Sequence, residues 1–182
     1  PGGLARGPSP LPIRFVDETI RMRFDPPWME VEGHYHLRND LPSRVSVGIL
    51  YPLPLDRGMD WPIAWEVLGV PSREVEARGL AWTVALEAFA EIDVVARYTQ
   101  FVADGADARY ILTTTSTWGR PLEHGTYSVQ WPASLDPEPR LSYPAPAVVE
   151  GDRKVVRFRR EQFLPPRDLV LRPGAPTPDR SA

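Results

Sequence analysis

The chain has 182 residues, of which 42% are hydrophobic and 25% are charged, and its formal net charge is −3. A chain of this length can bury a substantial core, and this composition excludes wholesale disorder. The net acidity argues against a nucleic-acid partner, and no apolar run of roughly eighteen residues is present to span a membrane. Cysteine is absent, which excludes thiol nucleophiles, thiolate metal sites and disulfides.

Proline is the unusual feature of the composition. There are 22 prolines, but none lies between Pro71 and Pro121 or between Pro146 and Pro165. Because proline removes a donor from a sheet ladder, these two windows predict interior strands or helices. The Pro- and Gly-rich ends predict flexible segments. The expected divisions are an N-terminal tail, a single domain and a C-terminal tail or linker: 1–11, 12–172 and 173–182.

Alternation of apolar and polar residues begins at Ile13 and predicts strands. The run from Ile13 to Phe24 alternates with one slip, which predicts one long bulged strand or a strand pair. Residues 31–38 alternate cleanly, turn-forming residues follow at 39–43, and residues 45–51 alternate again. We therefore predict that 31–38 and 45–51 pair as a β-hairpin.

The middle of the chain is less regular. Residues 56–71 predict a long irregular loop with a helical turn at 63–68. Residues 80–86 alternate and predict a strand that pairs with 92–101, although this stretch also fits helical spacing. Residues 110–118 are almost all β-formers with four threonines, which predicts a further strand.

Three more segments, 127–131, 155–163 and 168–171, bring the total to about nine or ten strands. Few helical patterns accompany them. The sequence therefore predicts an all-β chain that forms an antiparallel β-sandwich or a barrel.

The sharpest enzymatic hypothesis rests on histidine. His34 and His36 would lie on one face of a strand, Asp40 follows them, and His124 could supply a further ligand. This arrangement loosely resembles the first metal motif of cupins and would imply a metal-dependent enzyme. The glutamate expected after the histidines is absent, and so is a second motif. An exposed polar strand face is the alternative interpretation.

Two tryptophans suggest a different alternative. Trp61 and Trp65 flank a proline in the predicted loop, where they could form an exposed platform for a sugar or a partner protein. A loop pinned to the core by its aromatic residues explains them as well. No strained serine elbow or phosphate-cradling glycine loop is present, so we predict a protein that is not an enzyme and needs no cofactor.

Several runs of residues carry a family resemblance. They are Val31–Asn39, Ser46–Pro54, Tyr98–Gln100, Tyr110–Thr114 and Trp118–Leu122. Together they resemble VIT-like and related bacterial exported β-domains of unknown function. The resemblance implies an immunoglobulin-like sandwich that makes contacts outside the cytoplasm, and it carries over no catalytic residue.

From these observations we predict a non-catalytic binding or structural module of the bacterial cell envelope or exterior, with another protein or the envelope as partner. A periplasmic or extracellular location is expected because the chain opens at Pro1, as a matured or excised piece would, and because its Pro-rich end suits a spacer. A cysteine-free chain is equally compatible with the cytosol.

Overall fold

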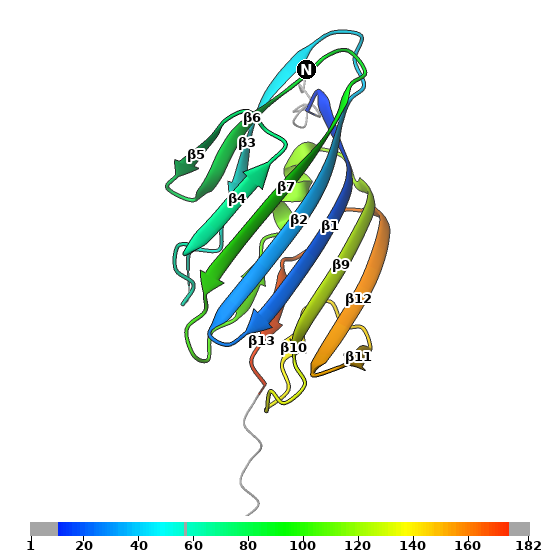
Figure 1. Cartoon of the computed structure of the whole chain (residues 1–182). Helices are drawn as coiled ribbons and strands as arrows, with labels where there is room; N and C mark the ends of the chain where they lie inside the picture. Colours follow the sequence, from blue (N-terminus) through cyan, green and yellow to red (C-terminus); the bar gives the residue numbers. More distant parts are fainter. Residues whose placement is uncertain (1–10, 57, 175–182) are drawn as a thin grey trace, which may run out of the picture.

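Strands make up nearly all the regular structure in the computed structural model, which describes residues 11–56 and 58–174 (Figure 1). The strands are β1 (Ile13–Asp25), β2 (Trp28–Asn39), β3 (Val45–Pro52), β4 (Ala64–Leu68), β5 (Arg73–Glu76), β6 (Gly79–Leu86), β7 (Glu91–Phe101), β8 (Ala108–Tyr110), β9 (Leu122–Pro132), β10 (Arg140–Leu141), β11 (Ala147–Glu150), β12 (Arg153–Phe163) and β13 (Leu169–Arg172). A single 3-10 helix, η1 (Thr113–Trp118), accompanies them in the described residues. The prediction of an all-β chain is confirmed, with thirteen strands in place of nine or ten.

The strands form one large sheet and two small ones. The large sheet has the order β11-β12-β9-β1-β2-β7-β4, and the small sheets have the orders β3-β6-β5 and β10-β13-β8. Buried side chains of both small sheets join those of the large sheet in one hydrophobic cluster. The large sheet is mixed, because β1 and β9 run parallel, whereas the sequence predicts antiparallel pairing throughout. The immunoglobulin-like sandwich stays a prediction.

Strand β1 is one long strand with a bulge, which confirms one of the two alternatives. Its register with β2 shifts between Phe15 and Asp17. A bulge inserts one residue and reverses the alternation beyond it. Ile13 is buried before the bulge, and Glu18 and Ile20 are buried after it. The bulge therefore places the carboxyl group of Glu18 on the inner face.

The predicted hairpin of 31–38 with 45–51 is wrong. Strand β2 pairs with β1 and β7, whereas β3 pairs with β6 in a small sheet. The predicted pairing of 80–86 with 92–101 is wrong for the same reason, since β6 and β7 lie in different sheets. In each case the chain leaves one sheet at the turn and enters the other.

Asn39 links the two segments in which the chain passes from one sheet to the other. Its side-chain amide donates to Ser43 O at 2.7 Å, in the first crossing, and to Glu87 O at 2.8 Å, in the second. Its Oδ1 accepts from the Leu41 backbone N–H at 2.9 Å. The asparagine is fully buried, so the turn residues that suggest a hairpin instead form a corner between sheets.

Two further local expectations are corrected. The helical turn expected at 63–68 is strand β4, which pairs with β7. The strand expected at 110–118 ends at Tyr110, and η1 follows. Asp168 Oδ1 accepts hydrogen bonds from the backbone N–H groups of Leu112 and Thr113, and the Ser116 hydroxyl donates to Thr113 O at 2.6 Å. These bonds give the threonine-rich run a helical turn that β propensity does not predict.

The predicted tails lie outside the described residues, apart from Leu11, Pro173 and Gly174. In the described ranges, no helix has the length and apolar character needed to cross a membrane.

Candidate functional site

A cavity of about 130 Å³ lies between the inner face of the large sheet, β3 and η1. We call it the Glu18 pocket. Buried residues at its base include Glu18, Tyr35, Tyr51 and Tyr110. Its lining also includes Leu50, which is 51% exposed, so the pocket reaches the surface. The remaining lining residues are Leu11, Phe15, Leu37, Gly48, Ile49, Pro52, Trp82, Val94, Ile111, Thr114, Thr115, Thr117 and Trp118.

Glu18 is the only charged residue that lines this pocket. Its Oε1 accepts a hydrogen bond of 2.8 Å from the Tyr127 hydroxyl. Its Oε2 has no hydrogen-bond partner, and the carboxyl makes no ion pair, among the described residues. Burial raises the pKa of Glu18 from 4.5 to about 7, although the Tyr127 hydrogen bond opposes the shift. The carboxyl therefore changes its charge near neutral pH.

Gly125 makes the contact between Glu18 and Tyr127 possible. It lies opposite Glu18 in the parallel β1–β9 register, two residues before Tyr127 on the same face. A Cβ at this position would lie 2.5 Å from the Tyr127 hydroxyl oxygen. Only glycine leaves room for the tyrosine ring to lie along its own strand toward Glu18.

The same arrangement occurs on β2, where Gly33 precedes Tyr35. A Cβ at Gly33 would lie 2.0 Å from the Tyr35 hydroxyl oxygen. This hydroxyl donates to Tyr51 at 3.0 Å, and 2.8 Å separates it from the Tyr110 hydroxyl. Since Tyr35 has only one proton to donate, Tyr110 donates to Tyr35 and the Tyr51 proton has no acceptor in this chain of bonds. Burial raises the pKa of all three tyrosines well above 10, so they stay protonated.

Aromatic rings form a continuous wall along the pocket. Successive ring centroids lie 5.3 Å apart for Trp118 and Phe15, and 5.8 Å apart for Phe15 and Tyr35. The series continues to Tyr51 at 5.9 Å and then to Trp82 at 5.7 Å. The Trp82 ring nitrogen is buried without a hydrogen-bond partner. Apart from this N–H group and the tyrosine hydroxyls, the wall is apolar.

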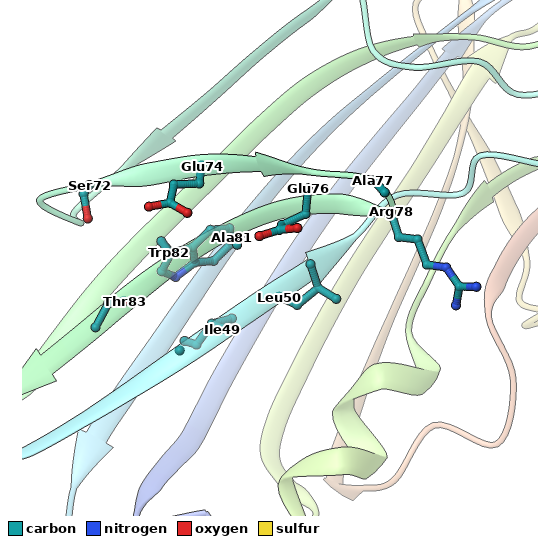
Figure 2. A pocket seen from close by; sticks show the side chains of 11 residues that line it. Ile49, Leu50, Ser72, Glu74, Glu76, Ala77, Arg78, Ala81, Trp82 and Thr83 are labelled. Carbon is teal, nitrogen blue, oxygen red and sulfur yellow. The ribbon is translucent and has the colours of Figure 1, made fainter.

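A wider groove of about 540 Å³ lies on the small sheet β3-β6-β5 (Figure 2). Figure 2 shows Glu74 and Glu76 directed from β5 toward β6, with Leu50 on β3 beyond them. Gly48, Ile49, Leu50 and Trp82 line both this groove and the Glu18 pocket. The groove has an acidic wall but no buried polar group comparable to Glu18, so we take the pocket as the candidate site.

The histidines of the metal hypothesis lie on the polar outer face of the large sheet. His36 pairs with Asp93 at 2.8 Å, and His124 pairs with Asp17 at 2.8 Å. Register places His36 and His124 on either side of Asp17 in one row across three strands. The Asp93 hydrogen bond raises the pKa of His36 above 6.5.

The other two residues of that hypothesis do not belong to this row. His34 bonds Glu32 at 2.8 Å, and Asp40 pairs with Arg14 and Arg38 beyond the end of β2. Residues 11–56 and 58–174 contain no cluster of three or more His, Cys, Asp or Glu side chains able to hold a metal ion. The metal-dependent alternative therefore gains no support from the geometry.

Trp61 and Trp65 are partly buried and pack against the core. Trp65 lies on β4 opposite Tyr98 of β7, and Trp61 lies in the segment before it. This packing agrees with the interpretation that the aromatic residues hold the segment against the core. It lends no support to an exposed binding platform.

Comparison with known proteins identifies the fold but no family. No protein-family model and no curated protein matches the chain. Among solved structures, the chain is similar to a proposed nutrient binding protein from Legionella pneumophila, with a TM-score of 0.59 and 16% sequence identity. The match covers 90% of this chain and 67% of that chain. At this identity the likeness shows the fold alone, and the VIT-like resemblance stays a prediction.

The sequence analysis did not identify Glu18. Two signals were available: a glutamate at an inward position after the slip in β1, and two Gly-x-Tyr triplets on strands, at Gly33 and Gly125. Neither reveals that Tyr127 and Glu18 meet, because they lie on strands far apart in sequence.

Proposed function

We propose that this protein is a non-catalytic binding module that holds a small molecule in the Glu18 pocket. The observation that carries the proposal is the buried carboxyl group of Glu18 in an aromatic pocket, where its Oε2 has no hydrogen-bond partner among the described residues. Ligand pockets are typically apolar, with a few polar groups that fix the ligand's orientation. Burying a carboxyl group with few partners is costly, and a ligand can supply a partner for Oε2.

The lining argues for binding over catalysis. General acid–base chemistry commonly uses two groups with different proton affinities, or a base beside a nucleophile. Here Glu18 is the only carboxyl group of the lining, no histidine or lysine joins it, and the tyrosines are held protonated. One carboxyl surrounded by hydroxyl groups and rings is suited to recognition.

The experiment is a small-molecule screen with a variant that fills the pocket. Thr114 lines the pocket from η1, and its side chain makes no hydrogen bond among the described residues. We expect Thr114→Phe to abolish the binding of any hit, as followed by tryptophan fluorescence and NMR shifts. Arg120→Phe adds the same ring two residues after η1, at an exposed position outside the pocket, and should leave binding intact. Hits that bind both variants equally well would overturn the proposal.

We also propose that the module works in the periplasm or outside the cell, in contact with another protein or the envelope. The support is the resemblance to exported β-domains described above. Fractionation of the native cells, with the chain followed by immunoblot, tests the location. Recovery in the cytosolic fraction alone would overturn it.

A further inference from the structure

The Glu18 pocket lacks a positive charge. No arginine, lysine or histidine lines it, and Glu18 takes part in none of the ion pairs of the described residues. A buried carboxylate is stable only when a cation or several donors compensate its charge. Among the described residues, the Tyr127 hydroxyl is its one hydrogen-bond donor. An anionic ligand would add a second negative charge, so the pocket chemistry disfavours it.

The walls of the pocket favour a cation that carries apolar groups. Six rings line the cavity, and five of them form a series from Trp118 to Trp82 in which each lies within 6 Å of its neighbour. Aromatic faces attract cations that lie within about 6 Å of the ring centroid, and quaternary ammonium groups are recognised by aromatic cages. A sugar would require many hydrogen-bonding groups, whereas Tyr35 already bonds to Tyr51 and Tyr110, and the free donors are the Tyr51 hydroxyl and the Trp82 ring N–H.

The size of the cavity limits the ligand. An engineered apolar cavity of roughly 150 Å³ holds benzene. At about 130 Å³, the Glu18 pocket suits a ligand of similar size, with a longer substituent directed toward Leu50 at the rim.

We propose that the ligand is a small organic cation, an alkylammonium whose charge pairs with Glu18 Oε2 while its alkyl groups contact the surrounding rings. This inference rests on the proposed function and specifies its ligand class. Below about pH 7, binding converts Glu18 from a carboxylic acid to a carboxylate, and the released proton passes to solvent.

Choline and 3,3-dimethylbutan-1-ol test the inference, because they share one shape and differ in charge. We expect choline to bind at least about tenfold more tightly than the alcohol at about pH 8. The choline Kd should fall about tenfold per pH unit up to about pH 6.5 and level off above about pH 7.5, because Glu18 ionises over this range. The groups that face Glu18 are Tyr127, Tyr35, Tyr51 and Tyr110, and none of them titrates there.

Two variants and one control test whether Glu18 and the aromatic wall cause the difference between choline and the alcohol. Glu18→Gln keeps the shape of the side chain and should raise the choline Kd at least about tenfold, while the Kd of the alcohol changes by less than about threefold. Trp118→Leu keeps the carboxylate and should weaken choline binding about threefold or more, with a smaller effect on the alcohol. Glu30→Gln removes an exposed carboxylate on the outer face and should change neither Kd.

Each other outcome overturns the inference in a distinct way. Equal binding of choline and the alcohol, or choline binding that weakens as pH rises, would overturn the cation while leaving the pocket as a small-molecule site. Choline binding lost in Glu74→Gln but kept in Glu18→Gln would move the site to the groove on β3-β6-β5. A failure of cationic, neutral and anionic probes alike would overturn the proposed function together with the inference.

Discussion

The Tyr127 hydroxyl donates a hydrogen bond of 2.8 Å to Glu18 Oε1, between strands β9 and β1, which pair in parallel. The bond joins residues that are 109 positions apart in the chain. It depends on the bulge that turns Glu18 inward and on Gly125, which leaves room for the tyrosine ring. It is the only hydrogen bond to this carboxyl within the described part of the chain.

Replacing this donor should destabilise the protein and raise the pKa of Glu18 further. We expect Tyr127→Phe to lower the free energy of unfolding by about 1–2 kcal/mol, because a buried acceptor loses its partner. Urea denaturation and the carboxyl ¹³C shift of Glu18 measure the two effects. Tyr98→Phe is the matched control, because Tyr98 is buried but its hydroxyl makes no hydrogen bond among the described residues. Equal losses in both variants would show that the Tyr127 bond contributes nothing of its own.

The raised pKa of Glu18 should make stability depend on pH. Below pH 4.5 the carboxyl is protonated in both states, whereas between pH 4.5 and about 7 only the unfolded chain releases the proton. The free energy of unfolding should therefore fall as pH rises through this window, by about 3 kcal/mol in total from this group. Glu18→Gln should remove that slope in denaturation curves. If Glu18→Gln keeps the full pH dependence of the unfolding free energy, that dependence comes from other titratable groups.

The corner at Asn39 should be a principal determinant of the fold. Asn39→Ala removes bonds to the Ser43, Leu86 and Glu87 carbonyls and to the Leu41 N–H. We expect a loss of about 2–4 kcal/mol in denaturant unfolding, since the buried carbonyls lose their donor. Ser43→Ala, at the exposed end of the same turn, is the control and should change stability little. A small effect of Asn39→Ala would mean that packing alone sets the corner.

Asp168 should control the order of η1 and thereby the shape of the pocket. Its Oδ1 accepts from the backbone N–H groups of Leu112 and Thr113 and from the Thr113 hydroxyl. We expect Asp168→Ala to lower stability by about 1–2 kcal/mol and to speed amide exchange across residues 112–118. Asp168→Asn keeps an acceptor oxygen and should cause a smaller change. Unchanged exchange in the alanine variant would contradict this role.

The sequence by itself determined the class of the fold. A strand with one buried face needs apolar residues at every second position, and this alternation located seven strands. They are β1, β2, β3, β6, β7, β9 and β12, predicted at residues 13–24, 31–38, 45–51, 80–86, 92–101, 127–131 and 155–163. The slip after Phe15 even indicated the bulge in β1. The sequence did not determine which strands pair, because two strands separated by a short turn can either form a hairpin or belong to different sheets.

Tertiary structure decided the rest. Asn39 turned the predicted hairpin into a corner, and Asp168 helped to turn a β-forming run into η1 through bonds across 55 and 56 residues of sequence. The candidate site also depends on contacts between residues that are far apart in the sequence. Glu18, Tyr127 and the Tyr51–Tyr35–Tyr110 chain come from five strands, and each alone looks like an ordinary strand residue. Their chemistry depends on burial and on contacts between distant strands, which local sequence patterns do not encode.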